Sequence, residues 1–71
     1  MGVPLSMLKS GESGLVTRIG GKPETRRFLE SLGFVVGAPV SVVNVINGNV
    51  ICSVMDSRIA ISKEMAQKIS V

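Results

Sequence analysis

The pattern of apolar and polar positions predicts one helix in a chain that is otherwise rich in strand-forming residues. Within residues 23–37 the apolar side chains recur at spacings of three and four, as they do along one face of a helix. This face comprises Thr25, Phe28, Leu29 and Leu32, and the opposite face carries Arg26, Arg27, Glu30 and Ser31. We expect the first face to cover the core and the second to face solvent or a partner.

The ends of this helix carry residues with clear positional preferences. Pro23 suits the first helical position, where its missing N–H costs nothing, and Glu24 suits the positive end of the helix dipole. Gly33 is expected to end the helix in a left-handed conformation, because glycine adopts positive φ without a steric penalty. Phe34 then folds back onto Leu29, and both phenylalanines of the chain are expected to lie in the core.

Five strands are predicted from runs of β-branched residues bounded by turn residues. They span residues 13–19, 40–45, 50–55, 58–62 and 69–71, with Gly14 at a bulge or a close approach of two backbones. A helical turn over residues 7–9, capped by Ser6, is expected before the first strand. A short helix over residues 63–68, capped by Ser62, is expected before the last strand.

The predicted hairpin at Asn47-Gly48 leaves two registers open, because its loop can hold two residues or three. A two-residue loop turns Val43 and Val45 to the core, whereas a three-residue loop over residues 46–48 turns Val40 and Val42 there. We favour the three-residue loop because it turns Ser41 outward. The outer side of the sheet is then lined by Val43, Val45, Ile51 and Met55.

A second tight turn is predicted at Asp56-Ser57, where Val54 would face Ile59 and Cys52 would face Ile61 on the core side, together with Val50. Short strands joined by tight turns, without βαβ alternation, predict a mainly β fold. It is a small, strongly bent antiparallel barrel of about five strands, with one central helix and a short C-terminal helix. Residues 1–71 are expected to form one domain.

The composition excludes most kinds of chemistry. The 71 residues include no His, a single Cys and five scattered acidic residues. We therefore predict no catalytic residues, no metal site and no cofactor, and we expect Cys52 to be a small buried core residue. With two Phe and no Tyr or Trp, neither a groove for proline-rich peptides nor a platform for stacking bases is expected.

The net charge of +3 comes from eight Lys and Arg against five Asp and Glu. The basic residues are spread along the chain, apart from a loose cluster between Arg18 and Arg27 that can face phosphates or an acidic protein surface. The chain shows no secretory signal pattern and no apolar run near the ~20 residues that cross a bilayer. A cytoplasmic location without direct membrane insertion is expected.

Four segments, in a consistent order and spacing, resemble a known family. They are residues 5–14, 18–21, 26–37 and 58–66, of which the densest is Arg26-Arg27-Phe28-Leu29-Glu30-Ser31-Leu32-Gly33. The chain resembles the FeoA family, the small A component of bacterial ferrous iron transport. The resemblance implies an SH3-like barrel and a partner, the large membrane component FeoB with its GTP-binding domain. It also implies that the chain assists or regulates FeoB and does not carry iron itself. Val36 departs from the family pattern, since many relatives have Pro there.

The leading hypothesis is a non-enzymatic module that contacts FeoB by its charged helix face. The proposed contact residues are Lys22, Arg26, Arg27 and Glu30. A homo-oligomer through the apolar outer sheet face is a further expectation. Two alternatives stay open, although neither nucleic acid nor metal is the expected ligand: a small basic barrel that binds nucleic acid, and a transition-metal-binding regulator.

Overall fold

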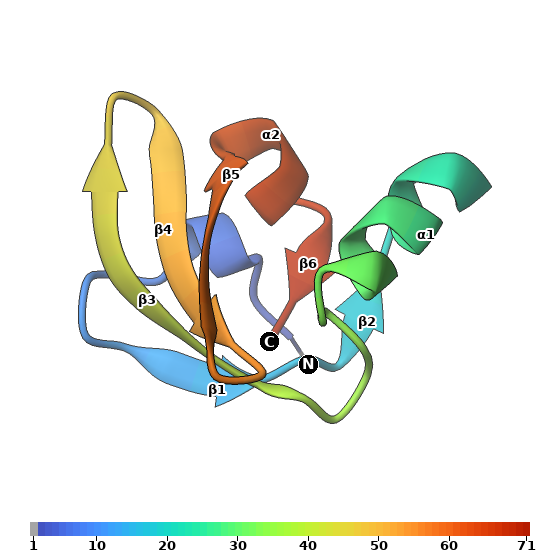
Figure 1. Cartoon of the computed structure of the whole chain (residues 1–71), viewed down its shortest axis with the longest axis horizontal. Helices are drawn as coiled ribbons and strands as arrows, with labels where there is room; N and C mark the ends of the chain where they lie inside the picture. Colours follow the sequence, from blue (N-terminus) through green and yellow to red (C-terminus); the bar gives the residue numbers. More distant parts are fainter. Residues whose placement is uncertain (1) are drawn as a thin grey trace.

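The computed structural model describes residues 2–71, in which six strands form two antiparallel sheets (Figure 1). The larger sheet has the order β1-β3-β4-β5, and the smaller pairs β2 with β6. The strands are β1 at Ser13–Leu15, β2 at Arg18–Ile19, β3 at Pro39–Ile46, β4 at Asn49–Val54, β5 at Ser57–Ser62 and β6 at Ile69–Ser70. The prediction of a mainly β fold is confirmed.

Three helical segments accompany the sheets. They are the 3₁₀ turn η1 at Leu5–Met7, the helix α1 at Pro23–Ser31 and the short helix α2 at Lys63–Ala66. Figure 1 shows α1 beside the small sheet, on the opposite side of the view from the turn that joins β3 to β4. The predicted central helix and short C-terminal helix are both present.

The strand predicted over residues 13–19 is divided between the two sheets. β1 pairs with β3, β2 pairs with β6, and the chain bends at Val16 and Thr17. The backbone stays paired through the bend, because the Val16 N–H donates to Ala38 O at 2.9 Å and the Thr17 N–H donates to Ser70 O at 2.8 Å. This division is why the described residues hold six strands and not five, and why they form two sheets without continuous barrel closure.

Gly14 sits where two parts of the chain meet closely, as predicted. A Cβ added to Gly14 would lie 3.2 Å from the Val71 Cβ, which is tighter than most van der Waals contacts. The last residue therefore packs across β1. The Val3 and Val71 N–H groups each donate to the other residue's carbonyl at 2.8 Å. The described N-terminal residues therefore lie along the edge of the small sheet opposite β2.

The hairpin of β3 and β4 has a two-residue loop, so the favoured three-residue loop is wrong. Asn47 and Gly48 both have positive φ, of 50° and 78°, and Ile46 pairs directly with Asn49. The predicted faces are nevertheless correct for Val40 and Val42, which are each 1% exposed. The reason is a bulge at Val43, where the register shifts by one residue and the faces exchange.

The outer face of the large sheet is more polar than expected. Ser41 lies opposite both Ser13 and Ser53, and Ser53 lies opposite Arg58, so one row across all four strands is polar. Val43 and Ile51 belong to this face as predicted. Val45, however, lies on the core side of the sheet, opposite the buried Val50, and Met55 belongs to the turn after β4. Val45 and Met55 are both exposed.

The turn between β4 and β5 is Met55-Asp56 and not Asp56-Ser57. Both residues have positive φ, of 51° and 63°, as the favoured hairpin turns of two residues require. Cys52 therefore lies opposite Ile59, and Val50 lies opposite Ile61. The predicted strand pairing differs from the observed pairing by two residues. Every side chain still lies on the predicted face, because side chains along a strand alternate with a period of two.

The two short helical segments differ from prediction mainly in their bounds. η1 begins after Pro4, whose extended conformation and carbonyl bond to the Met7 N–H at 2.9 Å start the turn two residues before the predicted position. Leu5 is buried and Leu8 packs against the core, as expected. The Ser62 cap of α2 is confirmed, because its Oγ accepts the Met65 N–H at 3.2 Å.

The core lies between the two sheets and is closed by the helical segments. Its largest fully buried side chains include Leu5 from η1, Leu29 from α1, Phe34 from the segment after α1, and Ile69 from β6. β3 and β4 contribute the alternating valines and Cys52. Side chains from both ends of the chain therefore fill one core, with α1 fixed to it by Leu29.

Candidate protein-contact surface on helix α1

The C-terminal end of α1 forms as the sequence predicts. Gly33 has a φ of 111° and its N–H donates to Glu30 O at 3.0 Å, while the Phe34 N–H donates to Leu29 O at 3.1 Å. These two bonds are the pair that characterises a Schellman ending, with Gly33 in the position that favours glycine. Phe34 is fully buried and Leu29 is fully buried, so the predicted contact region belongs to the core.

The face of α1 that meets the core is narrower than predicted. Leu29 is buried, Thr25 and Leu32 are half-buried, and Phe28 is 51% exposed. The prediction that Phe28 lies in the core is therefore wrong. Successive residues are about 100° apart around a helix, so Phe28 points well away from Leu29, its neighbour in sequence and the centre of the buried face.

The four predicted contact residues lie together at one helix. Arg26, Arg27 and Glu30 are exposed on α1. Lys22 is the exposed N-cap residue, and its carbonyl accepts the Arg26 N–H at 2.9 Å. Helical geometry puts Glu30 one turn from Arg26 and Arg27, so cationic and anionic groups alternate on this surface. We call the surface formed by Lys22, Arg26, Arg27, Phe28 and Glu30 the α1 surface.

Two side chains of this region could not be assigned from the sequence pattern. Phe28 is the first, and its exposure follows from the width of the buried face. Lys68 is the second: its Cδ would lie 3.0 Å from a Cβ added to Gly21, and its carbonyl accepts the Gly20 N–H at 2.7 Å. Lys68 thus borders the loop that leads into α1, because the pairing of β2 with β6 brings residues distant in sequence together.

The chemistry of the surface is that of solvated charges, with an exposed aromatic ring about 100° around the helix from Arg27. Exposed ion pairs contribute little stability, but they favour complementary partners and accelerate encounter. Arg offers a planar fork of donors that matches a carboxylate, while an aromatic ring offers apolar area. The arrangement is therefore suited to contact with another macromolecule and not to bond making.

Cys52 lies in the core, as predicted. Its side chain is 0% exposed, and its Sγ donates to Ile59 O at 3.6 Å. Burial raises the pKa of the Cys52 thiol from 9.0 to about 11, because the thiolate would lose its hydration. A thiol in this environment is a weak nucleophile and a poor metal ligand at neutral pH.

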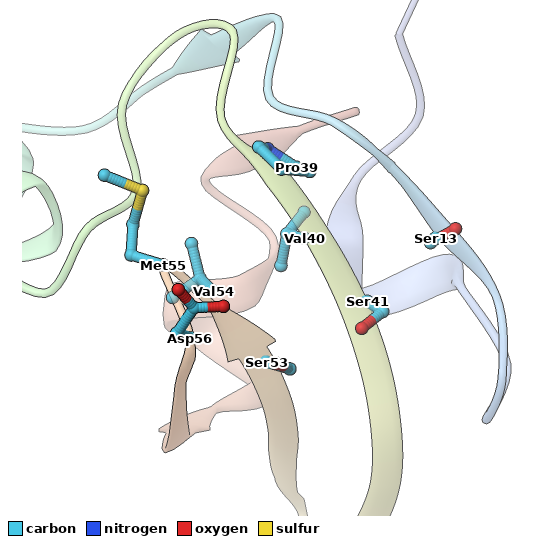
Figure 2. A pocket seen from close by; sticks show the side chains of 8 residues that line it. All are labelled: Ser13, Pro39, Val40, Ser41, Ser53, Val54, Met55 and Asp56. Atoms are coloured by element: carbon cyan, nitrogen blue, oxygen red, sulfur yellow. The ribbon is translucent and has the colours of Figure 1, made fainter.

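A groove of about 450 Å³ crosses the outer face of the large sheet near the β4–β5 turn (Figure 2). Figure 2 shows small Ser side chains from three strands along it, with Met55 and Asp56 at one end. It is lined by Ser13, Pro39, Val40, Ser41, Ser53, Val54, Met55 and Asp56. Its single carboxylate has no second acid or base beside it in this lining, so the groove lacks an acid–base pair.

Two kinds of site are absent from residues 2–71. No group of three or more His, Cys, Asp or Glu side chains is arranged to hold a metal ion within that range. Over the same range, no helix has the length and apolar character needed to cross a membrane.

The fold is that of a small SH3-like β domain. A family model described as "FeoA domain" matches residues 3–71, and the chain belongs to the FeoA family. The resemblance stated from the sequence is confirmed. The protein takes part in ferrous iron transport as a non-enzymatic accessory protein, in association with the Fe(2+) transport system.

Three similar proteins support this assignment. A candidate Fe(2+) transport protein A of Methanocaldococcus jannaschii is 37% identical over 68 residues, which cover 96% of this chain and 83% of the relative. A crystal structure of an iron uptake regulatory protein (FeoA) has a TM-score of 0.92 and 36% identity, covering 100% of this chain and 96% of that one. The zinc complex of Stenotrophomonas maltophilia FeoA, described as a procaryotic SH3 domain protein, has a TM-score of 0.80 and 25% identity, covering 97% and 86%.

Proposed function

We propose that this protein regulates ferrous iron uptake by direct contact with the FeoB-like GTPase-permease component, and that it does so in the cytoplasm. The proposal rests mainly on one observation. The charged side chains Lys22, Arg26, Arg27 and Glu30 are all exposed at one helix whose other side is fixed to the core by Leu29. A charged surface that the core does not need is available for a partner.

The mixture of residues on the α1 surface resembles the centre of many protein interfaces. Arg and aromatic residues are enriched among the side chains that dominate binding energy, whereas scattered exposed charges contribute little. Phe28 would supply apolar area, Arg26 and Arg27 would pair with carboxylates, and Glu30 would pair with a cation. We therefore expect the contacted face of the partner to carry carboxylates for Arg26 and Arg27, with an apolar pocket for Phe28 to one side, next to Arg27.

The rigidity of α1 adds to the proposal. The helix begins at Pro23, ends in the two bonds around Gly33, and is held by Leu29 with 0% exposure. A surface that is already ordered loses less conformational entropy when it binds. The side chains of the α1 surface can thus meet a partner without a change in the backbone.

The test is a binding measurement with the purified FeoB-like transporter in nanodiscs, and with its GTP-binding domain alone. Arg26→Glu and Arg27→Glu are each expected to weaken binding at least about tenfold, because each reverses a charge at the interface. Lys9→Glu is the matched control, with the same change in net charge. Lys9 is exposed in the loop between η1 and β1, and Figure 1 shows this loop on the side of the view away from α1.

The comparison with Lys9→Glu separates a local contact from general attraction. If all three variants weaken binding equally, the net charge and not the α1 surface governs association. If none of them changes binding, the surface is not the contact region. Circular dichroism and thermal unfolding of each variant establish that the fold is intact.

Two further measurements test the alternative functions. A nucleic-acid-binding barrel would be retained on DNA or RNA at low salt and released steeply as salt rises. A transition-metal-binding regulator would show a tight site in anaerobic calorimetry with ferrous iron. Either result, obtained from the purified chain alone, would replace the proposed contact with FeoB as the primary function.

A further inference from the structure

The strand β5 is an edge of the large sheet with backbone groups that no other strand uses. Within residues 2–71 its only strand partner is β4. Backbone N–H and C=O groups on such an edge form a ready template for another strand. This edge is independent of the α1 surface and of the contact with FeoB proposed above.

The hydrogen-bond pattern between β4 and β5 shows which residues of β5 direct their backbone N–H and C=O groups to the free edge. In an antiparallel pair, alternate residues direct their N–H and C=O groups to the neighbouring strand. The Lys63 N–H donates to Gly48 O at 3.1 Å, which continues the ladder of β5 on β4. Because the Lys63 N–H and, by alternation, both backbone groups of Ile61 point toward β4, those of Arg58 and Ala60 point to the free edge.

The usual features that block strand addition are largely missing from β5. Natural edge strands are often very short, carry Pro or Lys, contain a bulge, or are covered by another segment. β5 has six residues, no Pro or Lys, and an uninterrupted register with β4. Its one charged residue is Arg58, near the turn, and both Arg58 and Ala60 are exposed.

The side chains of this edge indicate that it is also incompletely covered. Ile59 lies opposite Cys52 on the core face, yet it is only half-buried whereas Cys52 is 0% exposed. An added strand would cover the part of Ile59 that remains in water. Burial of apolar area stabilises association by roughly 25 cal/mol per Å².

We propose that β5 pairs with β5 of a second copy of this chain, in an antiparallel arrangement with Ala60 at the two-fold axis. Ala60 then exchanges both backbone hydrogen bonds with its symmetry mate, and Ile59 lies opposite Ile61 of the second copy. The two large sheets become one continuous sheet across the dimer. The small Ala side chain at the axis allows the backbones to approach without a steric conflict.

Charge favours this register over its neighbour. With Ala60 at the axis, the two Arg58 residues are four positions apart along the strands, or about 14 Å. That distance exceeds the Debye length of about 8 Å at physiological salt, so their repulsion is largely screened. With Ile59 at the axis, the two Arg58 residues would be diagonal neighbours at about 7–8 Å.

The first test measures mass by sedimentation equilibrium over a range of protein concentrations. The wild-type chain is expected to show a monomer–dimer equilibrium. Ala60→Pro removes the outward N–H and leaves every N–H that bonds to β4, and Ala60→Lys places two like charges at the axis, so both are expected to shift the chain to monomer. Ala60→Thr keeps the N–H in a strand-forming residue and should retain the dimer.

The second test determines the register by disulfide formation with oxidised glutathione. Antiparallel partners that share hydrogen bonds have Cα atoms about 5.5 Å apart, within the range that a disulfide spans. Ala60→Cys is therefore expected to give a covalent dimer. Ser62→Cys is the matched control, because its two copies would be about 14 Å apart. The native Cys52 is buried and stays in place.

Several results would overturn the proposal. A wild-type chain that stays monomeric at every concentration would do so. So would a dimer that survives both Ala60→Pro and Ala60→Lys while Ile46→Lys dissolves it, because Ile46 is exposed on the outer face of β3 and its loss would indicate an interface there. Equal cross-linking of Ala60→Cys and Ser62→Cys would exclude the pairing with Ala60 at the axis.

Discussion

Gly33 and Met55 bring the end of α1 against the turn between β4 and β5. A Cβ added to Gly33 would lie 2.9 Å from the Met55 Cγ and 3.4 Å from the Met55 Cβ. Gly33 is therefore required for two independent reasons: its φ of 111° ends the helix, and its missing side chain admits Met55. This close approach packs the C-terminal end of α1 against the β4–β5 turn.

Replacement of Gly33 by alanine is expected to lower the free energy of unfolding by about 2–4 kcal/mol. The strain of a positive φ contributes about 1–2 kcal/mol, and the crowding against Met55 contributes a similar amount. Urea unfolding followed by circular dichroism measures the change. Because the Met55 side chain is flexible and exposed, part of the crowding can be relieved by its movement.

Gly37→Ala is the control for this prediction. Gly37 has a φ of 92° and no atom within 4 Å of an added Cβ, so its replacement introduces strain without crowding. We expect it to cost about 1–2 kcal/mol. Equal losses for the two glycines would show that the contact with Met55 contributes nothing. Met55→Ala should restore part of the stability of Gly33→Ala, with a coupling of at least about 0.5 kcal/mol.

Met55 itself is expected to be an unfavourable residue for its turn. It has a φ of 51° in a two-residue hairpin loop, where Asn is much preferred because its short side chain tolerates this conformation. Met55→Asn is therefore expected to be more stable than Met55→Ala by about 0.5–1 kcal/mol. Both variants lose the contact with Gly33, so the difference in denaturation midpoint isolates the turn. A less stable Asn variant would contradict this explanation.

The two hairpins explain why the core could be predicted while the turns could not. The predicted β4–β5 turn lies one residue later than the observed turn. This error changes the strand pairing by two residues and leaves each side chain on the same face of the sheet. The β3–β4 loop was assigned one residue too many, and the bulge at Val43 compensates for it. The alternation of apolar and polar residues predicts which side chains are buried. It does not predict that Met55 has a positive φ and therefore belongs to the turn.

At the candidate surface, residues close together in the sequence could be predicted as neighbours, whereas residues brought together by strand pairing could not. Arg26, Arg27 and Glu30 could be grouped from sequence because they are close neighbours on one helix. Lys68 could not, because its place beside Gly21 depends on the pairing of β2 with β6. The exposure of Phe28 was missed because helical periodicity identifies a face but does not show how much of that face the neighbouring strands cover.

The two phenylalanines are expected to respond in opposite ways to truncation. Phe34 is 0% exposed, and Phe34→Ala should cost about 3–5 kcal/mol of unfolding free energy because it leaves a cavity. Phe28 is 51% exposed, and Phe28→Ala should cost less than about 1 kcal/mol. Thermal unfolding of the two variants gives the comparison directly.

Phe28→Ala is also a test of the proposed binding role. If Phe28 anchors the contact with the FeoB-like component, the variant keeps its fold but binds at least about tenfold more weakly. Phe28→Leu keeps most of the apolar area and should lose less affinity. Full binding by Phe28→Ala would remove Phe28 from the α1 surface as a functional residue, while leaving the charged residues to be judged by their own variants.

The thiol of Cys52 is expected to make the folded state less stable at high pH. Its pKa is raised to about 11 in the folded chain, against 9.0 for an ordinary thiol, so the unfolded chain releases its proton first. Between pH 9 and pH 11 only the folded state keeps the proton, and the free energy of unfolding falls as pH rises, by up to about 2 kcal/mol. Below pH 9 both states are protonated and the thiol contributes no pH dependence. Chemical denaturation at pH 8 and pH 10.5, compared with Cys52→Ala, measures this term, because the other titrating groups are common to both proteins. An identical fall in stability for both proteins would show that the thiol is not the cause.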